Sequence, residues 1–271
     1  MRSLASAIAL GLLSLCASTS SAAARQVVDG PPALPAALRG DSFRIASVLT
    51  GRTYDIHVRF PEGYDPAAAT LYPTVYLTDG DSLFPILAAS HLFLHYDDRL
   101  PEALVVGIAY GGFDPSVNRR EIDFTHGVGA DAFQGFLRTE LLPEIERRYR
   151  SDPTRRVLFG QSRGGGFVIH SALTDPDLFW GRIASNAAFG PDESWTLDEP
   201  AAATRTDLSL FVASGENDRP ALRESALRWA GGWDGRETPW RLRFETIEGG
   251  THAADAANVY RRAMRWFFAA P

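Results

Sequence analysis

A serine flanked by glycines constrains this chain more than any other feature. Residues 157–167 read Val-Leu-Phe-Gly-Gln-Ser-Arg-Gly-Gly-Gly-Phe, so an apolar run leads into a Gly-x-Ser-x-Gly motif and a helical pattern follows it. A serine on a sharp strand-to-helix turn requires small residues two positions before and after it, and Gly160 and Gly164 stand there. The turn would expose the Ser162 hydroxyl above a sheet and present the Arg163 N–H at the positive end of a helix. The five-residue pattern also arises by chance, so the strand and helix around it carry the prediction of a nucleophile.

Strand and helix patterns alternate along the rest of the chain. Alternating apolar and polar residues over 43–50 and 53–60 predict a hairpin, and a continuous apolar run over 103–110 predicts a strand covered on both faces. This pattern predicts an α/β fold class, with a mostly parallel, doubly wound sheet, an N-terminal antiparallel hairpin and helices on both faces. We expect a single catalytic domain over residues 41–271, preceded by a linker rich in proline and alanine over 25–40.

The first 24 residues have the pattern of a secretory signal peptide. Arg2 is followed by an apolar run over 8–15 and by the small residues Ala22–Ala24. The run is too short to span a bilayer, so we expect cleavage near Ala24 and a periplasmic or secreted protein without stable membrane insertion. Two alternatives stay open: a lipoprotein signal in which Cys16, the only cysteine, is lipidated, or an apolar N-terminal helix that remains attached.

Charge restricts the class of partner. The chain has a formal net charge of −6, and removal of residues 1–24 takes away one arginine and no acidic residue, which makes it −7. A negative balance argues against nucleic acid or an anionic membrane surface as a partner.

Polar residues follow several predicted strands, where catalytic groups of α/β sheets gather. Asp218 and His252 come after two late strands, and Asp79-Gly80-Asp81 comes after an earlier one. The chain order serine, acid, histidine is that of α/β-hydrolases. The sequence therefore predicts a triad of Ser162, Asp218 and His252.

The residue types fit ester chemistry. His252 would accept the Ser162 proton during attack on an ester carbonyl and return it to the leaving alcohol. Asp218 would orient the imidazole, and the backbone N–H groups of Arg163 and Asp81 would bind the oxyanion. Three alternatives stay open: Glu216 as the acid, a Ser–His pair without an acid, and the neighbouring Gly80 N–H in place of Asp81.

Other side chains give weaker predictions. The remaining histidines lack ligand spacing and are expected to be structural or exposed; they are His57, His91, His95, His126 and His170. We expect no metal, and no cofactor, because no glycine loop carries the lysine of a phosphate-binding motif.

The motifs together resemble the esterase D family of α/β-hydrolases, and within it the IroE-like periplasmic siderophore esterases and related predicted hydrolases. The resemblance covers about residues 43–268 and rests on segments 59–64 (Arg-Phe-Pro-Glu-Gly-Tyr), 75–80 (Val-Tyr-Leu-Thr-Asp-Gly), 106–110 (Val-Gly-Ile-Ala-Tyr), 119–125 (Arg-Arg-Glu-Ile-Asp-Phe-Thr), 159–165 and 249–252 (Gly-Gly-Thr-His). Such relatives cleave siderophore trilactones, feruloyl or acetyl esters and small thioesters, and some transfer acyl chains.

The resemblance implies a serine esterase for a small soluble ester, with a siderophore-type lactone as the leading specific substrate. Arg119 or Arg120 would hold an anionic or catecholate part of the substrate, unless they form structural ion pairs with neighbouring acids. Trp195 and Phe113 would wall an aromatic acyl pocket, unless they are simply packed. The alternatives are an acyltransferase or a feruloyl or acetyl esterase on the same triad, and a non-catalytic binding protein on a hydrolase fold.

Overall fold

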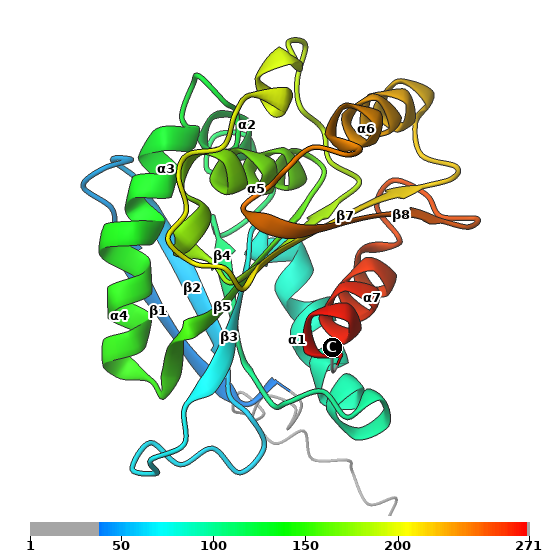
Figure 1. The fold of residues 1–271 in the computed structure, drawn as a ribbon. Helices are drawn as coiled ribbons and strands as arrows, with labels where there is room; N and C mark the ends of the chain where they lie inside the picture. Colours follow the sequence, from blue (N-terminus) through cyan, green and yellow to red (C-terminus); the bar gives the residue numbers. More distant parts are fainter. Residues whose placement is uncertain (1–37, 270–271) are drawn as a thin grey trace, which may run out of the picture. The chain divides into compact units, whose positions relative to one another are not determined.

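Eight strands form one sheet in the computed structural model of this chain, which describes residues 38–269 (Figure 1). The strands are β1 (Gly40–Ala46), β2 (Thr53–Arg59), β3 (Tyr72–Leu77), β4 (Leu104–Ala109), β5 (Ser151–Gln161), β6 (Gly181–Ser185), β7 (Leu208–Gly215) and β8 (Trp240–Ile247). Their spatial order is β1-β2-β4-β3-β5-β6-β7-β8. The predicted signal peptide, its cleavage near Ala24, Cys16 and most of the linker lie outside the described residues.

The first two strands form the predicted hairpin, although β1 ends at Ala46 and not at residue 50, so that residues 47–52 make the connection. Gly40 pairs with Arg59 and Ala46 with Thr53 in antiparallel register, and β2 is also antiparallel to β4. The remaining neighbours are parallel. The expected fold class, a mostly parallel doubly wound sheet with an N-terminal antiparallel hairpin, is confirmed.

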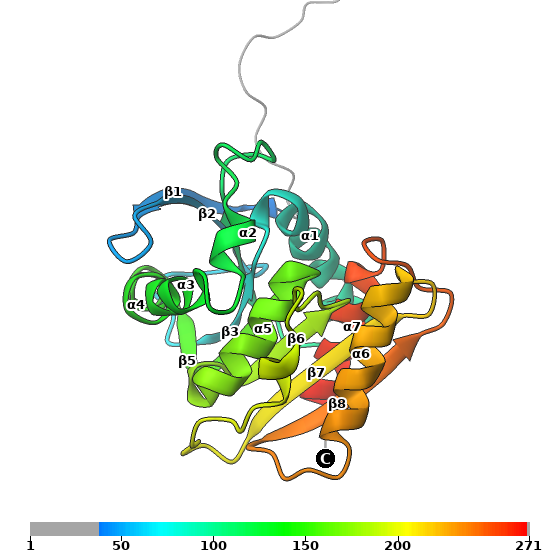
Figure 2. The ribbon, with the colours of Figure 1, turned by 90° about the horizontal axis from the view of Figure 1, so that it is seen from above.

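Helices cover both faces of this sheet (Figures 1 and 2). They are α1 (Gly80–Asp98), α2 (Arg120–Asp123), α3 (Ala130–Phe136), α4 (Leu142–Arg148), α5 (Arg163–Thr174), α6 (Pro220–Trp233) and α7 (Ala256–Phe268), with the π-helical turn η2 (Leu137–Leu141) and the short 3₁₀ turns η3 (Pro176–Leu178) and η4 (Ser194–Leu197). Helices α1 and α7 pack on one face, and α3 to α6 pack on the other.

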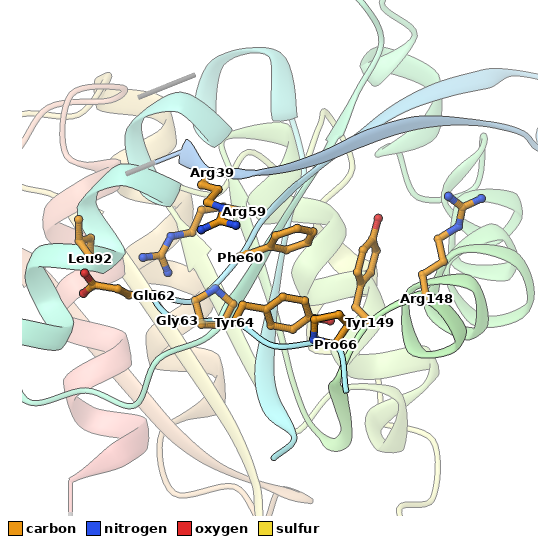
Figure 3. Close-up of a pocket in the computed structure, with 11 residues that line it drawn as sticks. Arg39, Arg59, Phe60, Glu62, Gly63, Tyr64, Pro66, Leu92, Arg148 and Tyr149 are labelled. Atoms are coloured by element: carbon orange, nitrogen blue, oxygen red, sulfur yellow. The ribbon is translucent and has the colours of Figure 1, made fainter. Parts of the chain in front are cut away.

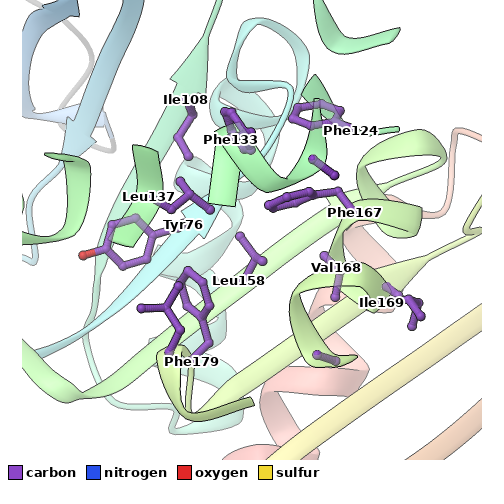
Figure 4. Close-up of a cluster of buried hydrophobic side chains, with 14 of the residues drawn as sticks. Tyr76, Ile108, Phe124, Phe133, Leu137, Leu158, Phe167, Val168, Ile169 and Phe179 are labelled. Atoms are coloured by element: carbon purple, nitrogen blue, oxygen red, sulfur yellow. The ribbon is translucent and has the colours of Figure 1, made fainter. Parts of the chain in front are cut away.

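The two cores follow from the alternation of side chains along each strand. On β4, Val105 packs toward α1 and α7, whereas its neighbours Leu104 and Val106 pack toward the opposite helices. Figure 4 shows part of this second core, where Phe167 of α5 meets Phe124 and Phe133. Burial on both faces explains why the inner strand β4 reads as a continuous apolar run.

Helix α1 begins earlier than its sequence pattern predicts. The residues over 83–96 predict a helix with Pro85 in its first turn, but the helix begins at Gly80. Pro85 then lies in the second turn, where its missing N–H would otherwise donate to the carbonyl of Asp81. The earlier start brings the Asp79-Gly80-Asp81 segment to the first turn of α1.

A buried arginine fixes the far end of α5. Arg182 is 1% exposed, and its guanidinium donates to the carbonyls of Ser171, Asp175, Pro176 and Phe179. Carbonyls at a helix C-terminus lack intrahelical donors and carry partial negative charge. A cation there satisfies them and holds the helix that follows Ser162.

A buried histidine joins the two helices on the other face. His91 of α1 lies within hydrogen-bond distance of the Tyr260 hydroxyl through Nδ1 (2.8 Å) and of the Pro101 carbonyl through Nε2 (3.1 Å). The carbonyl requires Nε2 to donate. Burial lowers the pKa of His91 to about 4. The imidazole is therefore neutral at pH 7, so Nδ1 accepts from the Tyr260 hydroxyl.

This arrangement predicts a loss of stability in mild acid. The unfolded chain protonates this histidine below its ordinary pKa of about 6.5, whereas the native state resists protonation until about pH 4, so the free energy of unfolding falls as pH drops through that window. In His91→Gln, whose amide can replace both hydrogen bonds without titrating, urea unfolding at pH 7 and pH 5 should show a pH-dependent loss smaller by about 2 kcal/mol than in the parent. Equal losses in the two proteins would contradict a neutral buried imidazole.

Candidate active site

Ser162 occupies a strained turn between β5 and α5. Its backbone has φ 58° and ψ −119°, a conformation that residues other than glycine rarely adopt. The Ser162 N–H donates to the Ser185 carbonyl (2.9 Å), and the Ser162 carbonyl accepts from the N–H groups of Gly166 (3.0 Å) and Ala188 (2.9 Å). Three backbone hydrogen bonds therefore hold the serine in this conformation.

The flanking glycines are required by close contact. A Cβ at Gly160 would lie 2.1 Å from the Gly164 carbonyl oxygen, and one at Gly164 would lie 2.4 Å from Thr78 Oγ1. Both distances are far below van der Waals contact. The sequence expectation that small residues flank the serine thus has a structural reason in the packing of β5, α5 and the segment after β3.

The structure brings the three predicted triad side chains together. Ser162 Oγ lies 2.9 Å from His252 Nε2, and His252 Nδ1 lies 2.8 Å from Asp218 Oδ1. Asp218 is 6% exposed and also accepts from the Arg219 N–H (2.6 Å). In this geometry the carboxylate can fix the imidazole so that Nε2 faces the serine hydroxyl.

Glu216, the alternative acid, points elsewhere. Its carboxylate accepts from the backbone N–H of Gly249 (2.8 Å), and the residue is exposed. Glu216 therefore ties its own loop to the loop of the histidine, and Asp218 is the acid within hydrogen-bond distance of His252.

Two residues that sequence analysis missed support this arrangement. Asn186, directly after β6, accepts from the Gly215 N–H (2.6 Å) and donates to the Thr251 carbonyl (3.3 Å), which joins the acid and histidine loops. Gln161 donates to the His252 carbonyl. The sequence signal for both residues was weak. Asn186 is a single polar residue at the carboxyl end of a short buried strand, and Gln161 occupies the variable position before the serine in the Gly-x-Ser-x-Gly motif.

Two backbone N–H groups expected to bind an oxyanion lie at helix starts. Arg163 is the first residue of α5 and Asp81 the second of α1, where N–H groups have no partner within the helix. The Asp81 carboxylate accepts from the N–H groups of Tyr110 (2.8 Å) and Gly111 (3.0 Å), which fixes this turn to the end of β4. The role of both N–H groups as oxyanion donors stays a prediction.

The two arginines proposed to hold substrate differ in their contacts. Arg120 forms a bidentate ion pair with Asp79, with Nε–Oδ1 at 2.7 Å and Nη2–Oδ2 at 3.1 Å. The sequence left open a structural ion pair with Glu121 or Asp123. Arg120 does contact Glu121 (Nη1–Oε1 3.4 Å), but its bidentate partner Asp79 lies 41 residues away. Arg119 precedes α2 and its carbonyl accepts from Ile122 and Asp123. A substrate contact for either side chain stays a prediction.

A small cavity of about 140 Å³ opens beside the serine segment. The cavity is lined by Asp79, Asp81, Ser82, Leu83, Phe113, Asn118, Arg120 and Gln161. Phe113 is 72% exposed at its rim. Trp195 does not line this cavity; it is buried and stacks on His126 at a centroid distance of 4.4 Å, so its contacts are those of a packed side chain.

A larger cavity of about 420 Å³ lies at the other end of the sheet (Figure 3). Its walls include Arg59, Phe60, Tyr64 and Tyr149. Arg59 pairs with Val105 near the beginning of β4, whereas Ser162 follows the end of β5. This cavity is therefore separate from the triad.

Within residues 38–269, no helix has both the length and the apolar character that crossing a bilayer requires. No group of three or more His, Cys, Asp or Glu side chains in that part of the chain is arranged to bind a metal ion.

Several known proteins with similar sequences are esterases. A model of the Esterase family, described as "Putative esterase", matches residues 47–267. The ferri-bacillibactin esterase BesA of Bacillus subtilis is 34% identical over 196 residues, which are 61% of this chain and 66% of BesA. The match therefore spans slightly less than two thirds of that relative.

Solved structures share the fold. The BES protein from Bacillus cereus superposes with a TM-score of 0.77 at 22% identity, over 90% of this chain and 99% of that one. An IroE-like serine hydrolase from Shewanella oneidensis gives a TM-score of 0.73 at 23% identity, over 84% and 79% of the two chains. At these identities the superpositions bear on the fold alone.

Crowding at Gly164 and open space at Gly231 predict opposite effects on stability when each glycine is replaced by alanine. Gly164→Ala would force a methyl group against Thr78 and Asp79 and should lower the free energy of unfolding by about 1–3 kcal/mol. The matched control is Gly231→Ala in α6, where a Cβ meets nothing within 4 Å, and alanine should raise stability by about 0.5–1 kcal/mol. Urea denaturation measures both; a tolerated Gly164→Ala would contradict the close contact.

Proposed function

The chain belongs to the Esterase family of carboxylic ester hydrolases, and we propose that it is an exported serine esterase acting on a small soluble ester. Membership of this family confirms the resemblance to the esterase D family and its IroE-like siderophore esterases. The observation that carries the proposal is the hydrogen-bonded series Ser162–His252–Asp218 at the carboxyl edge of the sheet.

The proposed reaction proceeds through an acyl-enzyme. His252 Nε2 takes the proton of Ser162 as Oγ attacks the ester carbonyl, and Asp218 stabilises the resulting imidazolium. The N–H groups of Arg163 and Asp81 hold the oxyanion. His252 then protonates the departing alcohol, and a water molecule, deprotonated by the same imidazole, releases the acid and restores the serine.

The proposed substrate is a siderophore-type lactone. Its support is the 34% sequence identity to BesA, which is named for ferri-bacillibactin, together with a cavity beside the serine segment whose lining includes Arg120 and Asn118. A test is incubation with bacillibactin, iron-free and ferric, with products identified by mass spectrometry. Ring-opened products carrying one added water support a trilactone hydrolase; intact lactone beside cleaved p-nitrophenyl ester would redirect the search to other esters.

Export is proposed from the predicted signal peptide, which lies outside the described residues. Expression of the full-length gene in a Gram-negative host, followed by fractionation and N-terminal sequencing, tests it. A periplasmic or secreted protein beginning near Arg25 is expected, whereas a full-length chain in the cytosol would contradict export.

Removal of the nucleophile should abolish turnover. Mature protein and Ser162→Ala are compared on p-nitrophenyl acetate, butyrate and octanoate, with hydrolysis expected in the parent and loss of at least about 10³-fold in the variant. The order of rates with chain length would estimate the size of the acyl pocket. Equal activity in the two proteins would show that Ser162 is not the nucleophile.

The acid assignment predicts a contrast between two neighbouring carboxylates. Asp218→Asn replaces the acceptor of the His252 Nδ1 proton by an amide and should lower kcat about 10⁴-fold. Glu216→Gln keeps an oxygen for the Gly249 N–H and should leave kcat near the parent value. Steady-state kinetics on p-nitrophenyl butyrate decide: a small effect of Asp218→Asn would favour a Ser–His pair, and a large effect of Glu216→Gln would favour the alternative acid.

A further inference from the structure

Asp79 holds an unusual position between β3 and α1. Its backbone is left-handed, with φ 53° and ψ 43°, although it is not a glycine. Its carbonyl accepts from the N–H groups of Ser82 and Leu83, both at 3.0 Å. The residue therefore forms the turn that presents the next two N–H groups, Gly80 and Asp81, at the start of the helix.

The Asp79 carboxylate lies against the serine turn. A Cβ on Gly164 would lie 3.1 Å from Asp79 Oδ2, so the carboxylate is packed at the first turn of α5. The preceding Thr78 donates its N–H to the Phe159 carbonyl (3.0 Å), three residues before Ser162. Asp79 is thus in contact with both segments that carry the proposed oxyanion donors.

The Asp79 carboxylate also binds α2, in the loop that follows β4. Its two oxygens accept from Nε and Nη2 of Arg120, while Arg163 pairs with Glu121 at 2.5 Å and donates to Thr125 (3.2 Å). Helix α2 is therefore held from both sides, by an ion pair to the β3–α1 turn and by one to the serine turn. The bidentate pair is 11% exposed at Asp79 and 27% at Arg120, so solvent screens it less than a surface pair.

Desolvation opposes the charge on this carboxylate. Burial raises the pKa of Asp79, and the hydrogen bonds and charge of Arg120 act in the opposite direction. Removal of the guanidinium would leave a buried carboxyl group without its main partner. The two side chains therefore act as one unit.

We propose that Asp79 is a positioning residue for the esterase reaction: through its ion pair with Arg120 it fixes the β3–α1 turn, and with it the Asp81 N–H, relative to Ser162. This inference rests on the proposed serine esterase function. Asp79 does not contact the reacting atoms; it determines where the oxyanion donor and Arg120 stand. Small displacements of such groups reduce turnover strongly.

The test separates the carboxylate from its backbone conformation. Asp79→Asn and Asp79→Gly both tolerate a positive φ, but neither provides two anionic acceptors for Arg120. In both variants kcat on p-nitrophenyl acetate should fall about 10- to 100-fold, with little change in KM. The rate at which a fluorophosphonate labels Ser162 should fall by a similar factor, because labelling requires the serine, histidine and oxyanion donors but no particular substrate.

The ion pair predicts non-additivity. Arg120→Gln should lower kcat, and Asp79→Asn combined with Arg120→Gln should be no slower than the slower single variant, because either change breaks the same unit. The matched control is Glu146→Gln, which weakens the pair between Glu146 and Arg156 (Nε–Oε1 2.6 Å). The Arg156 side chain is 19% exposed and the Glu146 side chain 23% exposed. This pair lies away from the described site. This control should keep the parent kcat and labelling rate.

The outcomes distinguish this proposal from the proposed function. If the parent hydrolyses ester and labels at Ser162, but folded Asp79→Asn and Asp79→Gly match it in kcat and labelling, the positioning role is wrong and the esterase stands. Equal slowing by Glu146→Gln, or losses that merely follow the free energy of unfolding, would also overturn the positioning role. A folded parent that neither hydrolyses nor labels would overturn both proposals.

Discussion

The rest of the site depends on one constraint, the close packing at the serine turn. There β5, α5 and the segment after β3 approach one another at Gly160 and Gly164, where a Cβ would not fit. Ser162 keeps a positive φ because its N–H and carbonyl are bound by Ser185, Gly166 and Ala188. That conformation is unfavourable by itself by about 1–3 kcal/mol. It persists because a relaxed turn would break these bonds and move α5 away from the sheet.

The histidine and acid loops are joined by hydrogen bonds to their backbone groups. Asn186 links Gly215 to Thr251, and the Asn217 N–H donates to the Gly250 carbonyl (2.7 Å). Because the three loops follow β6, β7 and β8, which are neighbours in the sheet, short polar contacts are enough to join them. A Ser–His–Asp geometry therefore depends on strand order as well as on the three side chains.

The sequence predicted those parts of the molecule that depend on periodicity and chain order. Apolar runs located the parallel strands, and the serine motif located the turn that Gly160 and Gly164 make possible. The Asp79–Arg120 pair could not be predicted, since it joins residues 41 positions apart whose proximity depends on loop conformation. Trp195 was ambiguous for the same reason: an aromatic in a loop can face a pocket or the core, and only its neighbours decide.

The long loop after β4 combines a fixed base with an exposed tip. Its base is held by the Asp81 contacts to Tyr110 and Gly111 and by the ion pairs at α2, whereas Phe113 and Val117 at its tip are 72% and 48% exposed. Side chains that contact the substrate away from the reacting bond can change at such a tip without disturbing the reacting groups. Specificity for the acyl or alcohol part is therefore expected to depend on the tip, while the ion pairs at the base keep Ser162 and its oxyanion donors in place.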